Sequence, residues 1–347
     1  MNDLFTPYEL KGLKLKNRIV MPPMCQYSVK NKDGFVTDWH YVHYVSRAIG
    51  GTGLIIIEMT DVEPDGRITD YDLGLWSDDQ ISGIKKIVDE CHKYGAKVAI
   101  QIAHAGRKAQ DAKIPVAPSP IPFDNKSKIP HELTTDEIKR IIENFRLSVR
   151  RAVKAGVDAI EIHGAHGYLI HEFQSSLTNK RTDEYGRDLY KFGKEVVEAA
   201  KSEIPANMPL IMRISAKEYV DNGYGINESI LFSKEYKNAG VDIFHVSSGG
   251  EGPIGSSGKP GTHAAYQVPL ARKIKETLNV PVIAVGKLDN PELANSVIGN
   301  NDADLVAVGR AMLRNPYWAL EASIKLNKEI NIPTQYKRGF PRIIRSS

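Results

Sequence analysis

The sequence predicts an α/β protein, a single-domain (β/α)8 TIM barrel, because short apolar runs alternate with amphipathic segments along its whole length. Several runs are apolar at consecutive positions, as parallel strands covered on both faces are. There are eight runs, the number that closes a barrel, whereas an open sheet requires no particular number. They are Arg18–Met21, Leu54–Glu58, Lys97–Ile102, Ala159–Ile162, Leu210–Ile214, Ile243–Val246, Val282–Val285 and Leu305–Val308.

The segments between these runs carry helix signals. Thr134–Glu137 is a capping box, and apolar residues then recur at helical spacing. A second apolar helix face extends over Ile81–Cys91. The tetrapeptide Ala-Gly-Val-Asp occurs twice, each time directly before a predicted strand, and both copies are typical of a helix end followed by a strand, at Ala155–Asp158 and Ala239–Asp242.

Three segments interrupt the alternation. Lys113–Pro130 is rich in proline and follows the third run, and Ser247–His263 follows the sixth. Long loops after barrel strands lie on the C-terminal face, where barrel enzymes carry their lids. The third segment, Asn331–Ser347, is basic and follows the last helix. We therefore expect residues 1–330 to form the barrel and residues 331–347 to form a C-terminal extension.

The composition indicates a globular protein with a full core, since 41% of the residues are hydrophobic and 25% are charged. A formal charge of +4, without basic runs interleaved with aromatics, does not favour nucleic-acid binding. We expect no membrane partner and a cytoplasmic location, because there is neither a signal-peptide pattern nor an apolar run of spanning length. Cys25 and Cys91 are too few for a disulfide scaffold, a four-cysteine zinc site or an iron–sulfur cluster.

His163, His166 and Tyr168 follow the fourth run, and ligands bind where parallel strands end. Two histidines three apart can ligate a metal or donate hydrogen bonds to a carbonyl or carboxylate oxygen. His104 and His245 lie at other strand ends, so the spacing leaves a metal open. A single histidine is more often satisfied by hydrogen bonds in the core. Two histidines and a tyrosine at one strand end favour a functional site.

The turn after the first run contains Pro22 and Pro23, which fix the backbone and remove two N–H donors. Such a turn suits packing against a planar surface. Cys25 and Tyr27 belong to the same turn. A free cysteine is commonly a small buried hydrophobe, which favours packing for Cys25, and Tyr27 is explained equally well by packing.

Polar residues also end other predicted strands. Gln101 and Arg213 end the third and fifth runs. An arginine in a barrel mouth is costly unless it meets an anion, which is either a ligand or a carboxylate such as Glu161 or Asp221.

Two glycines follow the last two runs. Gly286 follows the seventh run, and Gly309 with Arg310 follows the eighth. Barrels often bind phosphate at these loops, where backbone N–H groups converge and an arginine adds charge-assisted bonds. The glycines could simply turn the chain, but two at matching positions favour phosphate.

Longer motifs point to one family. They are Lys16–Val20, Pro23–Tyr27, Gly66–Asp70, Gln101–Lys108, His163–Phe173 and Asp304–Arg310. With these motifs the chain resembles the Old Yellow Enzyme family (NADH:flavin oxidoreductases), which are FMN-dependent ene-reductases, and is most similar to its "thermophilic-like" bacterial NADPH dehydrogenases. The resemblance extends over essentially the whole chain, from Leu4–Pro7 to Tyr336–Phe340.

The resemblance implies FMN at the C-terminal mouth of the barrel, NADPH or NADH as electron donor, and no metal. Arg213 would lie near flavin N1 and O2 and stabilise the anionic reduced flavin, and the sulfur of Cys25 would modulate its redox potential. The positions that match flavin contacts are Pro22, Pro23, Met24, Cys25, Met59, Gln101, Arg213, Gly286, Gly309 and Arg310.

The resemblance also implies a ping-pong reduction of an electron-poor alkene, an α,β-unsaturated carbonyl or nitro compound. His163 and His166 would donate hydrogen bonds to the carbonyl or nitro oxygen. Tyr168 would protonate the α-carbon as general acid, and Tyr27 would also bond the carbonyl. Arg338 would enter the site of a neighbouring subunit, so the protein would be a homodimer or homotetramer.

Two departures from the family pattern bear on these expectations. Arg187–Phe192 is shorter than the corresponding family segment and lacks its Asn-Arg pair, which leaves the start of the fourth outer helix open. The loop Ser247–His263, with its Lys259, is longer than the family pattern predicts.

Three alternatives stay open at this point. One is a 2,4-dienoyl-CoA reductase-like barrel, although those relatives add an iron–sulfur motif and further domains. Another is a metal-dependent hydrolase barrel that uses His163 and His166 as ligands. The last is a flavin protein without catalytic activity.

Overall fold

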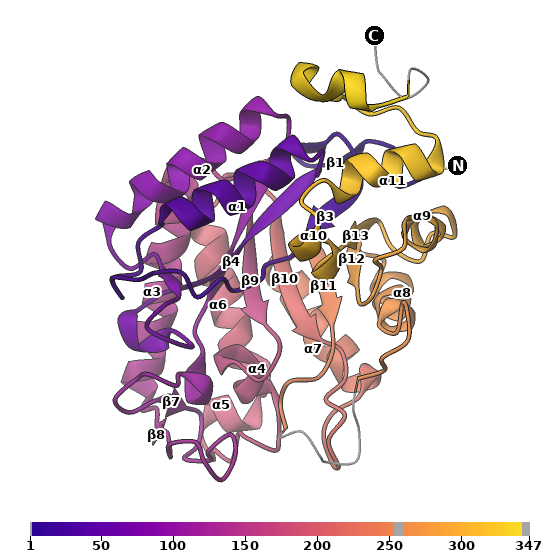
Figure 1. The fold of residues 1–347 in the computed structure, drawn as a ribbon. Helices are drawn as coiled ribbons and strands as arrows, with labels where there is room; N and C mark the ends of the chain where they lie inside the picture. The colour runs from indigo at the N-terminus through magenta and orange to yellow at the C-terminus, as the bar shows by residue number, and fades with distance from the viewer. Residues whose placement is uncertain (1, 253–259, 342–347) are drawn as a thin grey trace.

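The computed structural model describes residues 2–252 and 260–341 and shows a closed barrel of eight parallel strands surrounded by helices (Figure 1). The strand order is β3-β13-β12-β11-β10-β9-β6-β4, and β3 pairs with β4 to close the ring. All eight predicted runs are confirmed as barrel strands. They are β3 (Ile19–Met21), β4 (Leu54–Asp61), β6 (Lys97–Ala103), β9 (Ala159–Gly164), β10 (Leu210–Ser215), β11 (Ile243–Ser247), β12 (Val282–Val285) and β13 (Leu305–Ala307).

The helices that cover the barrel are amphipathic, and their apolar faces meet the strands. The longer ones are α1 (Asp38–Ile49), α2 (Ile81–Lys93), α3 (Thr135–Lys154), α6 (Lys191–Glu203), α7 (Ile226–Ala239), α8 (Val268–Leu278), α9 (Pro291–Gly299) and α11 (Trp318–Leu326). Shorter pieces are α4 (Leu169–Gln174), α5 (Glu184–Arg187), α10 (Arg310–Arg314), and the 3-10 turns η1 (Pro64–Gly66), η2 (Asp78–Gln80), η3 (Gly106–Lys108) and η4 (Thr334–Gly339).

Helix α3 shows how local chemistry sets these bounds. The Thr134 hydroxyl accepts the N–H of Glu137 at 3.3 Å, and the Glu137 carboxylate accepts the N–H of Thr134 at 2.7 Å. This exchange satisfies donors that a helix start otherwise leaves unpaired. The predicted capping box is therefore confirmed.

The amino end of the barrel is closed by a hairpin that the sequence did not predict. Strands β1 (Tyr8–Leu10) and β2 (Leu13–Leu15) pair antiparallel. Leu13 and Leu15 join an apolar cluster formed near the starts of the barrel strands by residues such as Leu54, Ala159 and Ile243. Because this end is filled by side chains, the opposite end is left for a ligand.

Small additions appear in the long loops. Strand β5 (Leu73–Gly74) extends the sheet beside β4, and β7 (Val116–Ala117) pairs with β8 (His131–Glu132) across the proline-rich segment. The shortened stretch Arg187–Phe192 still supports a helix, since α6 begins at Lys191. Lys259 of the loop after β11, and Arg342 and Arg345 of the C-terminal extension, lie outside the described residues.

Within residues 2–252 and 260–341, every helix is too short or too polar to span a bilayer.

Candidate active site

The predicted His163, His166 and Tyr168 lie together at the end of β9. The His163 ring meets the His166 ring edge-on at 5.2 Å between centroids and the Tyr168 ring at 4.9 Å. His166 has a left-handed backbone with φ of +62°, which is costly for a residue other than glycine. Such strain is typical of a functional site, and here it turns the chain so that three polar rings share one strand end.

Both imidazoles are neutral, because burial and the nearby Arg213 guanidinium lower the pKa of His163 and of His166 well below the ordinary value. His163 Nδ1 accepts the N–H of Ala165 at 3.3 Å, so its ring hydrogen lies on Nε2. His166 Nε2 lies 2.7 Å from the Ser247 hydroxyl oxygen. When Ser247 donates this bond, the His166 ring hydrogen lies on Nδ1. Each histidine then offers one N–H donor.

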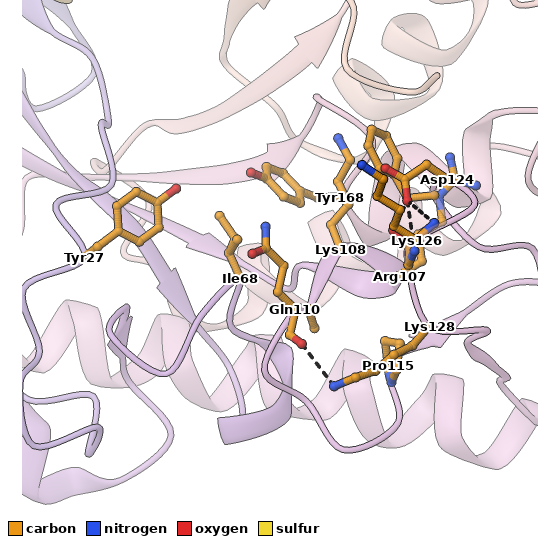
Figure 2. A pocket seen from close by; sticks show the side chains of 13 residues that line it. Tyr27, Ile68, Arg107, Lys108, Gln110, Pro115, Asp124, Lys126, Lys128 and Tyr168 are labelled. Carbon is orange, nitrogen blue, oxygen red and sulfur yellow. Dashed lines mark hydrogen bonds between the residues drawn. The ribbon is translucent and has the colours of Figure 1, made fainter. Parts of the chain in front are cut away.

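Tyr27 and Tyr168 face each other across a cavity of about 550 Å³. Figure 2 shows their two hydroxyl groups directed toward one another, with Ile68 between them. Burial, followed by the influence of Cys25, raises the pKa of Tyr168 well above the ordinary value, so its phenol keeps its proton. Tyr27 is half exposed and also has a left-handed backbone, with φ of +50°.

An apolar cluster supports this cavity. Met59 and Ile68 are buried in it, and the partly buried Cys25 and Tyr168 pack against it. Burial and the Asp72 carboxylate raise the pKa of the Cys25 thiol well above the ordinary value, which keeps the sulfur neutral. Of the predicted cofactor residues, Cys25 and Met59 therefore lie beside the candidate proton donor.

Most of the other predicted cofactor residues line a second cavity of about 370 Å³. His166 lies in its wall, so this cavity and the tyrosine cavity share one loop. The turn after β3 and the loops after β12 and β13 meet here, since Gly309 faces Met24 and Pro22. The predicted residues in the lining are Pro22, Pro23, Met24, Arg213, Gly286, Gly309 and Arg310.

Charge in the second cavity is predominantly positive. Arg213 is 9% exposed, and its Nε has no hydrogen-bond partner in the described part of the chain. The ion pair with Glu161 that the sequence left open does not form, because that carboxylate accepts Gln101 Nε2 and is bonded to His245 Nδ1, each at 2.7 Å. Glu161 therefore fixes the orientation of the Gln101 side chain. The Arg213 guanidinium remains available to an anionic ligand.

The carboxylate at the edge of the second cavity does not offset this charge. Asp289 lines the cavity but pairs with Arg314 at 3.0 Å. Lys287 and Arg310 line the same wall. A cavity with two arginines, a lysine and glycine backbone fits a phosphate-bearing ligand.

Metal ligation by His163 and His166 lacks a third ligand. In the described ranges, the group of acidic, cysteine or histidine side chains close enough to hold a metal consists of His171, Glu218 and Glu251. That group excludes both predicted histidines. His171 uses Nδ1 to accept the Gly167 N–H and Nε2 to contact the Tyr224 hydroxyl, so its ring is already satisfied.

Arg338 does not join this site within its own chain. It belongs to η4, which Figure 1 shows at the end of the molecule opposite α4, α5, β7 and β8. Its predicted role therefore depends on a neighbouring subunit.

Several site residues were not singled out from the sequence. Lys108 lies at the end of the Gln101–Lys108 motif, where the sequence alone indicates no role for it, and it lines the tyrosine cavity. Ser247 and Gln267 line the second cavity, and Gln267 is oriented by Ser248, whose hydroxyl donates to Gln267 Oε1 at 2.6 Å. The position of Ser247 at a strand end was the signal that could have identified it.

Comparisons with known proteins identify the family of the chain. The profile of the NADH:flavin oxidoreductase / NADH oxidase family matches residues 3–329. An NADPH dehydrogenase from Listeria monocytogenes serotype 4a (strain HCC23) is 47% identical over 343 residues, covering 98% of this chain and 100% of that protein.

Solved structures share the barrel. Morphinone reductase in complex with tetrahydroNAD superposes with a TM-score of 0.79 at 26% identity, covering 100% of this chain and 95% of that one. A 2-naphthoyl-CoA reductase shares the fold with a TM-score of 0.83 at 24% identity, and the match covers 94% of this chain and 52% of that one. The Old Yellow Enzyme resemblance is confirmed: this chain belongs to the NADH:flavin oxidoreductase / NADH oxidase family, and is an oxidoreductase that takes FMN as cofactor and NAD(P)H as electron donor.

Proposed function

We propose that this oxidoreductase reduces electron-poor alkenes, α,β-unsaturated carbonyl or nitro compounds, in a ping-pong reaction in which NAD(P)H and the alkene use the same pocket in turn. The observation that carries the proposal is the neutral phenol of Tyr168 beside the neutral imidazole of His163, with Tyr27 across the same cavity. An acid beside a fixed hydrogen-bond donor suits a substrate that gains negative charge on oxygen and a proton on carbon.

The residues of the second cavity fit FMN. The guanidinium of Arg213, which is buried and whose Nε has no hydrogen-bond partner among the described residues, would meet the electron-rich edge of the ring, and Arg310 with the glycine loops would hold the phosphate. Pro22 and Pro23 would abut the ring, and Met24, Cys25, Met59 and Gln101 are the further contacts that we propose. When bound, FMN supplies the hydride that passes from NAD(P)H to the β-carbon of the alkene.

The protein's own groups complete the reaction. His163 and His166 donate hydrogen bonds to the substrate oxygen, so charge that develops there meets donors already in place. Because both rings are neutral, they donate hydrogen bonds without giving up a proton. Tyr168 gives its phenol proton to the α-carbon, and Tyr27 holds the carbonyl from the opposite wall.

The direct test is product analysis with 2-cyclohexenone and NADPH under anaerobic conditions. We expect one NADPH oxidised for each cyclohexanone formed, and no oxidation above background with cyclohexanone as the acceptor. NADPH oxidation without any saturated product would contradict the alkene assignment while leaving the flavin oxidoreductase assignment in place.

Gly286→Ala is expected to weaken FMN binding. Gly286 has φ of +127°, and an added Cβ would lie 2.9 Å from Gln267 Nε2 and 3.1 Å from the Tyr266 ring. Strain of this kind costs about 1–3 kcal/mol, which lowers affinity by about five- to 150-fold. Flavin fluorescence titration of the apoprotein measures the change. Gly299→Ala is the control, because no atom lies within 4 Å of its added Cβ; equal affinity of the two variants would remove Gly286 from the cofactor site.

The C-terminal extension, residues 331–347, serves a neighbouring subunit in our proposal, in which the protein is a cytoplasmic homodimer or homotetramer. Arg338 is exposed and lies at the end of its own chain opposite the loop helices. Arg338→Ala should therefore raise the KM for the alkene by about tenfold, the scale of one lost charge-assisted contact. Gln335→Ala, an exposed neighbour in η4, should not. Light scattering gives the assembly state, and a monomeric parent enzyme would contradict this role.

A further inference from the structure

Lys108 joins three parts of the active site that are distant in sequence. It ends η3, the turn after β6. Its Nζ donates to the carbonyl oxygen of His166 at 2.7 Å and to that of Gly250 at 2.5 Å. The loop that carries the two histidines is thereby tied to the loop after β11 by one ammonium group.

The two loops meet so closely at this point that glycine is required on both sides. A Cβ on Gly167 would collide with the Gly250 carbonyl oxygen and lie 3.0 Å from Lys108 Nζ. A Cβ on Gly250 would collide with the His166 backbone. His166 itself is held at a costly φ of +62°. The ammonium bridge therefore stabilises the strained turn that positions the His166 ring.

No carboxylate neutralises this ammonium at ion-pair distance within residues 2–252 and 260–341. Glu251 pairs with Arg107 at 3.1 Å, and the Glu172 carboxylate accepts the Arg107 N–H at 2.9 Å. Lys108 Nζ instead lies over two aromatic rings, 4.3 Å from the Phe123 centroid and 5.3 Å from the Tyr168 centroid. A cation over an aromatic face is attracted by it, and more strongly when that ring carries negative charge.

Tyr168 needs such a neighbour if it is to release its proton. Its other surroundings oppose ionisation, since burial and the nearby Cys25, Tyr27, Asp72 and Asp61 all raise its pKa. The negative charge of a tyrosinate spreads into the ring, so a cation over the ring face stabilises it. In the described structure, Lys108 is the cation placed over this ring.

We propose that Lys108 is a positioning residue for proton transfer: its ammonium fixes the His166 turn and stabilises the negative charge left on Tyr168 when the phenol protonates the substrate. The inference rests on the proposed alkene reduction. In the step concerned, the O–H bond of Tyr168 breaks and a C–H bond forms at the α-carbon with the electron pair of the enolate. The tyrosinate then regains its proton from water, and no electrons change hands.

Two substitutions of Lys108 distinguish the effect of its charge from its effect on the structure of the loops. Lys108→Met removes the ammonium at similar length, and Lys108→Arg keeps a cation that donates hydrogen bonds. Lys113→Met is the matched control, because Lys113 is exposed on the segment that follows and does not line the cavity. Each variant is used only as FMN-loaded protein, and Lys108→Gln replaces Lys108→Met if that variant does not retain FMN.

We expect Lys108→Met to slow reoxidation of the reduced enzyme by 2-cyclohexenone about tenfold or more, part of what a general acid contributes. Reoxidation by ferricyanide, which takes electrons without a proton, should be unchanged, as should the limiting rate of reduction by NADPH. The solvent isotope effect on the cyclohexenone step should rise, because proton transfer becomes more rate-limiting. Lys108→Arg should restore most of the rate.

A second measurement does not depend on activity. Hydrogen exchange of the peptide that contains His166, Gly167 and Tyr168 should be faster in Lys108→Met than in the parent, and unchanged in Lys113→Met. Unchanged exchange together with an unchanged cyclohexenone rate would overturn the inference. Equal slowing with ferricyanide and cyclohexenone would also overturn it, since the defect would not lie in proton transfer.

Failure of the proposed function has a different signature. A parent enzyme that forms no saturated product from any electron-poor alkene would overturn alkene reduction, and with it the role of Lys108 toward Tyr168. A parent that reduces 2-cyclohexenone at the same rate as Lys108→Met would overturn the Lys108 inference alone.

Discussion

Tyr168→Phe is expected to slow the transfer of hydride and proton to an alkene by about 10²-fold or more, the usual contribution of a positioned general acid. Reduction of the enzyme by NADPH should stay within about twofold, because that half-reaction gives no proton to carbon. The phenylalanine keeps the packing of the Tyr168 ring against the apolar cluster that contains Met59 and removes only the hydroxyl. The variant therefore tests the proton and not the shape of the cavity.

Stopped-flow measurement of the two half-reactions decides this prediction. Tyr71→Phe is the control, because Tyr71 is an exposed tyrosine outside the cavity lining. Equal slowing of both half-reactions would contradict the proton-donor role and indicate damage to the FMN site instead. A rate close to that of the parent with 2-cyclohexenone would assign the proton to another group, of which the Tyr27 hydroxyl across the cavity is the first to examine.

The barrel could be predicted from the sequence because its signals are local. A buried strand such as β4 begins with four consecutive apolar residues, and α3 begins with an adjacent capping box. The hairpin of β1 and β2 could not be predicted in this way, because two three-residue strands carry almost no periodic pattern. What holds it is the tertiary contact of Leu13 and Leu15 with the barrel interior.

The residues of the site likewise differ in whether local sequence signals or tertiary contacts bring them together. His163, His166 and Tyr168 are close in sequence, so one strand end brings them together and the sequence sufficed to group them. His166 and Gly250, whose carbonyl oxygens accept hydrogen bonds from Lys108, are 58 and 142 residues away from it. No local sequence pattern indicates these contacts. Arg213 is an intermediate case. Its position at a strand end is visible in the sequence, but its unpartnered Nε within the described residues depends on tertiary contacts, since Gln101 and His245 occupy the Glu161 carboxylate.

Replacing both His163 and His166 by Ala should abolish the tight binding of phenols, which resemble the enolate oxygen of the reacting alkene. Removing one preorganised donor of this kind costs about 10²–10³-fold in kcat. His163 is the more direct donor, because Ala165 fixes its tautomer with the hydrogen on Nε2. His163→Ala alone should therefore cost more than His166→Ala, whose ring also depends on Ser247.

Titration of the flavin spectrum with 4-hydroxybenzaldehyde measures this prediction without turnover. The parent should show a spectral change that saturates, and the double alanine variant should show none at the same concentrations. His163→Gln should recover part of the binding, because its amide supplies an N–H donor. His131→Ala is the control, since that histidine lies on the surface in a pair with Glu137. A double variant that binds the phenol as tightly as the parent would place the oxygen site elsewhere, and the donors on the opposite wall, led by Tyr27, would then have to carry the developing charge.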